Sequence, residues 1–336
     1  MRKGDTILFD TPPTIMAFAA VGGKKEGEGP FAADFDMLIS DTTCGEKTWE
    51  KAESDFASRA LEAVLQKSKL RLSTLDAVFA GDLQCQCTAS AYAMRGFDVP
   101  FLGLYGACST MTEGIGLASC MVAGGHMEHA LAMTSSHFCT AERQYRTPLE
   151  YGGKRTPTSQ WTVTAAGAAI VAKRGGPPYV KAVTFGRVRD YAITDINNMG
   201  AAMAPAAAQT LLNYLKDTGN TPAMFDAIYT GDLGKVGSAL FLELLAAEGV
   251  TVENHADCGL LIYDCAAQNV KAGGSGAGCS AGVLCCHVLP QLATGAKKRV
   301  LFMSTGALMS QTTFLQGESI PGVAHLLELA SEKEDL

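Results

Sequence analysis

Helix-like segments and short apolar runs alternate along the chain, and the same order of segments occurs twice. In the first copy the segment TWEKAESDFASRALEAVLQKS (48–68) precedes the apolar, strand-like run LDAVFAGDL (75–83). In the second copy APAAAQTLLNYLKDTG (204–219) precedes FDAIYTGDL (225–233), and both apolar runs end in Gly-Asp-Leu. Self-similarity of this kind indicates a duplicated unit.

The later segments of the two copies also correspond. GACSTMTEGIGLASCMVAGG followed by ALAMTSSH (106–137) matches GAGCSAGVLCCHVLPQLATG followed by VLFMSTGA (276–307), so that Cys108 meets Cys279. Each copy therefore predicts a helix, a strand, a Gly-rich turn, a long helix and a second strand. This alternation is typical of right-handed crossover units on a parallel sheet with helices on its faces. The Gly/Ala/Ser/Cys helix is apolar nearly all round, which predicts burial between two sheets.

Length and composition are those of a large globular α/β protein. The 336 residues divide into a first half, 1–185, which carries the Cys108 helix, and a second half, 186–336, which carries the Gly-rich loop. Only 18% of residues are charged, so we expect a partner subunit to cover part of the surface. The net charge of −7, without a basic run, argues against a nucleic-acid groove. No uninterrupted apolar segment is long enough to predict a membrane span, and Asp10, Pro12 and Pro13 argue against a signal peptide.

The eleven cysteines lie in apolar contexts such as VLCCHVL (283–289), which is typical of reduced thiols in a reducing compartment. Two clusters could suggest zinc: Cys85 with Cys87, and Cys285 and Cys286 with His287. Neither has the C-x-x-C spacing that a tetrahedral site prefers, so we predict no metal site.

Cys108 is the first candidate for chemistry because it stands where a buried helix begins. Unpaired N–H groups and the helix dipole lower the pKa of a thiol at that place, and they also favour bound anions without any covalent step. Acyl transfer needs, in addition, a base or a cation and donors for the developing oxyanion. Nucleophile and anion site therefore both remain possible interpretations.

A cysteine at the start of a buried helix, in the first half of a duplicated α/β chain, resembles the thiolase and ketoacyl synthase superfamily. That resemblance implies a five-layer αβαβα fold and a homodimer. Further segments resemble a family of sporulation proteins within this superfamily; they are LYGACSTMTE (104–113), TSSHFCTAERQYRTPLEYGG (134–153), TDINNMGAAMAPAAA (194–208), TGDLGKVGS (230–238), AGGSGAGCSAG (272–282) and ESIPGVAH (318–325).

The resemblance to the sporulation proteins implies a ligand and a cellular role. The ligand would be dipicolinate, a small flat dianion that often carries calcium, and we expect no other cofactor. The chain would be a soluble protein of cytoplasmic type, attached peripherally to the spore inner membrane through channel proteins of the same operon. It would serve the movement of dipicolinate during sporulation and germination.

The chain departs from the superfamily enzymes at both second-half loops. Those enzymes have a histidine in the loop that matches 230–237 and a histidine or asparagine in the loop that matches 272–278. Here Asp232 occupies the first position and Ser275, or its neighbour Gly276, the second. A carboxylate beside Cys108 would raise the pKa of the thiol. We therefore expect a vestigial nucleophile in a non-catalytic binding pocket, with a ketoacyl-synthase-type acyltransferase using Cys108, or a purely structural scaffold, as alternatives.

Three further residues are predicted to bind the ligand. His137 lies just past a strand that ends near the expected pocket, and Arg143 and Arg146 follow in ERQYR. Arginine suits bidentate recognition of carboxylates. The alternative for both arginines is a structural pairing with Glu142 or Glu150. Asp82 and Asp232, in the two Gly-Asp-Leu copies, are either pocket carboxylates or caps of the turns after their strands.

Overall fold

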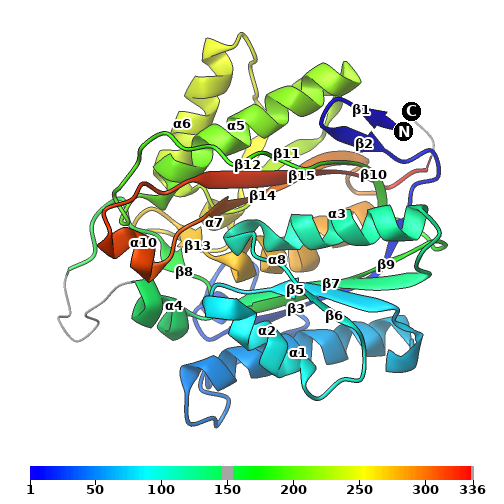
Figure 1. Cartoon of the computed structure of the whole chain (residues 1–336), viewed down its shortest axis with the longest axis horizontal. Coiled ribbons are helices and arrows are strands. Elements are labelled where there is room, and N and C mark those ends of the chain that lie inside the picture. Colours follow the sequence, from blue (N-terminus) through cyan, green and yellow to red (C-terminus); the bar gives the residue numbers. More distant parts are fainter. Residues whose placement is uncertain (146–153, 334–336) are drawn as a thin grey trace.

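The structure is a computed structural model that describes residues 1–145 and 154–333. Five layers of helices and sheets are stacked in it (Figure 1). Helices α1 (Trp49–Ser68) and α2 (Thr88–Met94) cover one outer face, and α5 (Met199–Thr218) and α6 (Gly234–Ala247) cover the other. Helices α3 (Thr110–Ala123) and α8 (Ala277–Val283) lie between the two sheet layers. The predicted αβαβα architecture is confirmed.

Both halves contain the same order of strands, which confirms the duplication. The five strands of the first half are, in spatial order, β3 (Thr14–Gly23), β9 (Ala165–Ala172), β7 (His129–Ser136), β5 (Ala77–Gly81) and β6 (Phe101–Gly103). Their counterparts are β10 (Tyr179–Thr184), β15 (Gly322–Ala330), β14 (Arg299–Ala307), β11 (Ala227–Thr230) and β12 (His255–Asp257). The pair Tyr179 and Thr14 joins the two layers into one continuous hydrogen-bonded sheet.

Each sheet layer is mixed, where the sequence pattern predicted a parallel sheet. Strands β6, β5 and β7 are parallel, but β9 is antiparallel to both of its neighbours, and β15 repeats this in the second half. The last strand of each half returns without a helix that crosses the sheet, so it runs in the opposite direction. The second repeat begins with β10, whereas the division at 185/186 assigns that strand to the first half.

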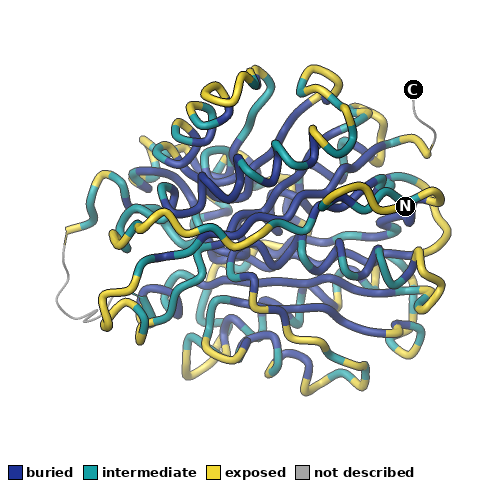
Figure 2. The backbone as a smooth tube through the Cα atoms, turned by 45° about the horizontal axis from the view of Figure 1, so that its top comes forward, coloured by how far each residue is buried: buried dark blue, intermediate teal, exposed yellow. Residues whose placement is uncertain are grey.

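The central helices owe their burial to small residues. In α3, Gly114, Gly116, Ala118 and Ser119 are buried, and every residue of α8, most of them small, is buried (Figure 2). Helix α1 has one apolar stripe instead: Phe56, Ala60 and Val64 recur at helical spacing and face the sheet. Its N-cap Thr48 accepts a hydrogen bond from the backbone N–H of Lys51. The buried stripe also contains one acid, Glu53, which is fully buried.

Smaller elements complete the fold. They are β1 (Arg2–Lys3), β2 (Thr6–Leu8), β4 (Met37–Ile39), β8 (Trp161–Thr162), β13 (Gly274–Ser275), α4 (Phe138–Tyr145), α7 (Cys258–Leu261), α9 (Leu289–Ala293) and α10 (Gln311–Leu315). Strands β8 and β13 pair in parallel and bring the two halves together beside α4. Within the described ranges, none of the helices combines the length and the apolar character that crossing a membrane requires.

Candidate functional site

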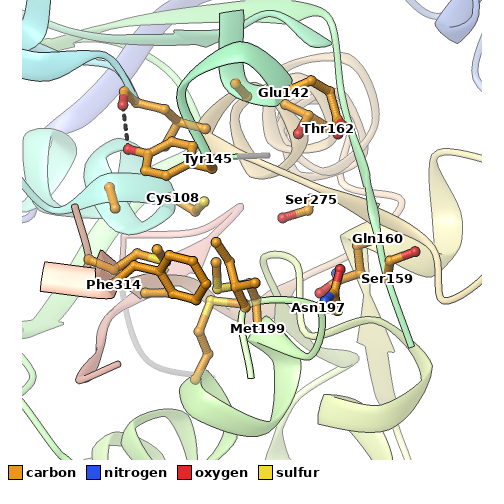
Figure 3. Close-up of a pocket in the computed structure, with 17 residues that line it drawn as sticks. Cys108, Glu142, Tyr145, Ser159, Gln160, Thr162, Asn197, Met199, Ser275 and Phe314 are labelled. Atoms are coloured by element: carbon orange, nitrogen blue, oxygen red, sulfur yellow. Dashed lines mark hydrogen bonds between the residues drawn. The ribbon is translucent and has the colours of Figure 1, made fainter. Parts of the chain in front are cut away.

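A cavity of about 290 Å³ opens between the two halves, with the Cys108 side chain at its wall (Figure 3). Its apolar wall comes from α4, α5 and α10, and its polar wall comes largely from 159–162 and Ser275. The residues that line it are Leu83, Ala107, Cys108, Ala141, Glu142, Tyr145, Ser159, Gln160, Thr162, Ile196, Asn197, Met199, Met203, Ser275, Ala307, Met309 and Phe314. None of these described lining residues is a lysine or an arginine.

Cys108 lies in a short 3₁₀ turn, Ala107–Ser109, that leads directly into α3. The turn is held by Ser109, whose backbone N–H and hydroxyl both donate to the carbonyl of Gly106, and by the Thr110 hydroxyl, which donates to Ala107. It packs closely on Gly306 of β14, where a Cβ would lie 2.3 Å from the Gly106 carbonyl oxygen. The predicted place of Cys108 at the start of the buried helix is confirmed.

Asp232 is fully buried and lies against Cys108. Its carboxylate accepts hydrogen bonds from the Thr305 hydroxyl (2.7 Å), the backbone N–H of Gly276 (2.9 Å) and the Ser275 hydroxyl (3.2 Å). The Cys108 thiol lies close enough to this carboxylate for the two groups to affect each other's pKa. Three of the predicted site residues, Asp232, Ser275 and Gly276, are thus brought together at the cysteine.

The charge state of the cysteine follows from these neighbours. Burial raises the pKa of the Cys108 thiol well above its ordinary value, and the negative charge of Asp232 raises it further. Burial also raises the pKa of Asp232, while its donors act in the opposite direction. The expected direction of the Asp232 effect on the thiol is therefore confirmed, and the arrangement stabilises a protonated thiol.

Two residues that the sequence analysis missed hold the Asp232 loop in place. Asp257, at the end of β12, accepts hydrogen bonds from the backbone N–H groups of Leu233 (2.8 Å) and Gly234 (2.9 Å). Burial raises the pKa of Asp257 to about 6. The Gln160 side-chain amide donates to the backbone carbonyls of Asp232 and Gly274, both at 2.7 Å. No local motif marks either residue, because their partners are backbone groups distant in sequence.

His137 points away from the cavity, which corrects its predicted role in the pocket. Its Nδ1 accepts from the backbone N–H of Cys139 (3.1 Å), so the proton is on Nε2, which donates to the Thr42 carbonyl (2.9 Å). The ring packs against Trp49 and Phe56 of α1, and burial lowers its pKa. It is a neutral residue of the α1–α4 contact.

The remaining histidines do not supply a base either. His255 contacts the Thr230 hydroxyl, His325 accepts from the backbone of Gly186, and His287 stacks on Phe31. All six histidines of the chain, including His126 and His129, are among the described residues, and none of them lines the cavity.

Arg143 also points elsewhere: it forms an ion pair with Glu50 of α1, and 53% of its side chain is exposed. Arg143 therefore has the structural role given above as the alternative, but its partner is Glu50 and not Glu142 or Glu150. Arg146 and Glu150 lie outside the described residues.

Arg155 is a cation behind the cavity wall that the sequence analysis missed. It pairs with the cavity residue Glu142 and donates to the carbonyl of Gln160 (2.9 Å). Its guanidinium lies 4.8 Å from the ring centre of Trp161, which adds a cation–π contact. The stretch around it, GGKRTP (152–157), has the composition of an ordinary polar loop, so nothing in the sequence marked it.

A second cavity of about 310 Å³ adjoins the first, with which it shares Leu83, Ala107, Tyr145, Ala307 and Met309. The Tyr145 hydroxyl donates to the Leu83 carbonyl at 2.6 Å (Figure 3), and both residues line both spaces. Asp82 lines the second cavity and accepts from the backbone N–H groups of Gln84 (2.9 Å) and Ser90 (2.7 Å). Asp82 thus caps a turn, the second of the two interpretations given above.

In the part of the chain that the structure describes, no three His, Cys, Asp or Glu side chains are grouped as they would be around a metal ion. All eleven cysteines are free thiols.

Comparison with known proteins shows the family to which the chain belongs. Residues 3–330 match the family described as Stage V sporulation protein AD (SpoVAD). The Stage V sporulation protein AD of Bacillus subtilis (strain 168) is 43% identical over 321 residues, which are 95% of each chain. Among solved structures, cerulenin-bound OleA of Xanthomonas campestris superposes with a TM-score of 0.62 at 14% identity, over 96% of this chain and 100% of that one. A second cerulenin-bound crystal of OleA has a TM-score of 0.60, also at 14% identity, over 98% and 99%. The chain belongs to the Stage V sporulation protein AD family and has a thiolase-like fold.

Proposed function

We propose that the chain is a non-catalytic binding protein for dipicolinate, held in the cavity beside Cys108, and that it serves the movement of dipicolinate across the spore inner membrane during sporulation and germination. The family relationship supports the cellular role. The buried carboxylate of Asp232 beside the buried thiol of Cys108 is the observation that carries the non-catalytic part. Ionising the thiol would bury a second negative charge next to the carboxylate, so the unreactive, protonated thiol is favoured.

Acyl transfer is disfavoured by the proton balance of the site. Each unit by which the pKa of Cys108 rises lowers the thiolate fraction about tenfold at neutral pH. Asp232 is no free base, because its oxygens already accept from Thr305, Ser275 and Gly276. A general base must accept a proton from sulfur and later donate it to the leaving group, so it needs an oxygen that is not already engaged by other donors.

The cavity has the chemistry that a small flat dicarboxylate requires. Met199, Met203 and Phe314 offer an apolar side for the ring, while Thr162 and Asn197 offer a hydroxyl and an amide donor for the carboxylates (Figure 3). Its volume of about 290 Å³ suits a ligand of that size. The start of α3 adds the partial positive charge of a helix N-terminus.

We propose that arginine side chains balance the ligand's remaining charge. Arg155 lies behind the cavity residue Glu142, with which it pairs, and Arg146 remains a predicted ligand donor. We propose that calcium, when present, arrives on the ligand. The proposed partners are a second copy of the chain and membrane channel proteins of the same operon, through which the chain attaches peripherally to the membrane.

Calorimetric titration of the purified chain with dipicolinate tests this function. We expect saturable binding of one ligand per chain, weakened several-fold in Thr162→Val, which keeps the side-chain shape and removes the hydroxyl. Isophthalate, which has the same two carboxylates and lacks the ring nitrogen, serves as the analogue control. A folded chain that binds no dipicolinate would refute the proposal. Turnover of acetyl-CoA that disappears in Cys108→Ala would establish the acyltransferase alternative instead.

A further inference from the structure

Helix α4 forms part of the cavity wall, and two acids of α1 hold it. Ala141, Glu142 and Tyr145 of α4 line the cavity. On the other side of the helix, Arg143 pairs with Glu50 and the Thr140 hydroxyl bonds to Glu53. The position of α4 against α1 therefore sets the shape of the ligand site.

Glu53 is the central group of this contact. It is fully buried and lies within hydrogen-bond distance of three groups: the Thr140 hydroxyl on α4, the Gln84 amide (2.8 Å) on the loop after β5, and the Ser135 hydroxyl (3.3 Å) on β7. The same loop accepts hydrogen bonds at the Leu83 carbonyl from Gln144 and Tyr145 of α4. One carboxyl group thus joins α1, α4, β7 and the loop whose Leu83 lines both cavities.

The contacts of Thr140 place a proton on Glu53. The Thr140 hydroxyl oxygen lies within hydrogen-bond distance of Glu53 and also 2.8 Å from the carbonyl oxygen of His137. A hydroxyl has one proton, and a carbonyl can only accept. Both contacts are satisfied when Thr140 donates to the carbonyl and a protonated Glu53 donates to Thr140.

The charges around Glu53 agree with this assignment. Asp82 approaches from the loop, His137 is neutral at the end of β7, and the Glu50–Arg143 pair is internally balanced. Strands β3, β5 and β9 carry no ionisable side chain, the Tyr92 of α2 is exposed, and the other acid of α4, Glu142, pairs with Arg155. Burial and the nearby Asp82 raise the pKa of Glu53 to about 8. The described surroundings hold no unpaired cation that would stabilise an ionised Glu53.

We propose that Glu53 is a positioning residue whose proton clamps α4 against α1, so that losing this proton loosens the cavity wall and weakens ligand binding. Ionisation leaves two like charges, Glu53 and Asp82, buried side by side, and moving α4 away admits water to them through the second cavity. The effect on the ligand rests on the proposed function. The clamp itself does not depend on the identity of the ligand.

Hydrogen exchange of the α4 amides between pH 6 and pH 8, corrected for the intrinsic exchange rate, tests the clamp without any ligand. In the wild type we expect the protection of α4 to fall tenfold or more over this range. Glu53 keeps its proton in the closed form and loses it on opening, so the opening equilibrium becomes up to tenfold more favourable for each pH unit. In Glu53→Gln, which keeps a donor and an acceptor but cannot ionise, protection should not change with pH. Glu62→Gln, an exposed acid of the same helix, is the matched control and should behave as the wild type.

A second variant tests the same clamp with Glu53 in place. Asp82→Asn removes the like charge, so the pH at which α4 loosens should move to a lower value than in the wild type. The inference is overturned if the wild type shows no loss of protection, if Glu53→Gln loses it equally, or if Asp82→Asn leaves the midpoint unchanged.

Dipicolinate titrations of the same proteins separate the inference from the proposed function. Wild-type affinity should fall about tenfold or more from pH 6 to pH 8, and that of Glu53→Gln should stay constant. A pH-dependent α4 with pH-independent affinity would overturn the link to the ligand. Normal clamp behaviour without dipicolinate binding at any pH would refute the proposed function and leave the clamp standing.

Discussion

The two Gly-Asp-Leu copies follow equivalent strands, β5 and β11, yet their aspartates have different hydrogen-bond partners. Asp82 turns toward its own loop, where it caps Gln84 and Ser90. Asp232 turns toward Cys108 and binds Thr305, Ser275 and Gly276. In the second half another residue, Asp257, caps the loop. Because Asp257 caps the loop of the second half, Asp232 is free to face the site. Asp82 has to cap its own loop and therefore cannot do so.

The two matched cysteines differ in the same way. Cys108 lies in the turn before α3 and faces the cavity, while Cys279 lies inside α8. The Cys279 thiol contacts the Gly231 carbonyl at 3.5 Å, in the Gly-Asp-Leu loop of its own half. The duplicated fold thus offers two similar positions, and only the first half uses its cysteine to line the cavity.

The largest expected effect is the loss of Asp232. Asp232→Ala leaves the Thr305 hydroxyl and the Gly276 N–H buried without an acceptor, so we expect the free energy of unfolding to fall by about 3 kcal/mol or more. The comparison with Asp82→Ala, measured by urea denaturation, sharpens the argument, because a lost cap costs about 1–2 kcal/mol. Equal losses in the two variants would show that the two aspartates are equivalent after all.

The pH dependence of stability should come next in size. In Glu53 and Asp257 the folded pKa lies above the ordinary value, at about 8 and about 6. Each group therefore stabilises the fold fully below its unfolded pKa and loses that contribution as pH rises through its folded pKa. His255 and His325, whose pKa values burial lowers to about 4, contribute the opposite slope below about pH 6.5. Urea denaturation between about pH 6.5 and pH 8 should therefore show a falling free energy of unfolding, by at most about 1.4 kcal/mol per pH unit and group.

Two variants divide that slope between the halves. Relative to the wild type, Glu53→Gln should remove a falling contribution over the whole range from about pH 5 to pH 8, and Asp257→Asn should remove one that ends at about pH 6. A wild-type stability that rises between about pH 6.5 and pH 8 would contradict the assignment.

The two arginines of ERQYR should differ in their effect on affinity. Arg146→Ala should weaken dipicolinate binding about tenfold, or about 1.4 kcal/mol, if the residue meets a ligand carboxylate as predicted. Arg143→Ala should leave affinity within twofold, because this side chain pairs with Glu50 and is half exposed. Calorimetry on both variants decides the matter, and a stronger effect of Arg143→Ala would reverse the assignment.

The cysteine pair gives the smallest predicted effects. Cys108→Ala should fold normally and change dipicolinate affinity by a few-fold, with no loss of any turnover. Cys279→Ala should leave affinity unchanged and lower the free energy of unfolding by about 1 kcal/mol, through the small cavity it creates. Parallel titration and denaturation of the two variants measure both quantities, and an affinity change confined to Cys279→Ala would contradict their assigned places.

The sequence by itself determined the duplication, which follows from the repeated apolar patterns. The five layers and the meeting of Cys108 with Asp232, Ser275 and Gly276 were implied by the resemblance to the thiolase and ketoacyl synthase superfamily. The directions of β9 and β15 did not follow, because an apolar strand reads the same in a parallel and an antiparallel pairing.

Only the tertiary structure decided which side chains of 137–145 face the cavity. In a helix, successive residues point about 100° apart, so one short segment sends Glu142 and Tyr145 to the cavity and Thr140 and Arg143 to α1. His137, just before the helix, follows the second group. Arg155, Gln160 and Asp257 became visible only with their distant partners in place. Side-chain direction at a site depends on how elements far apart in the chain are packed, and local sequence carries no record of that packing.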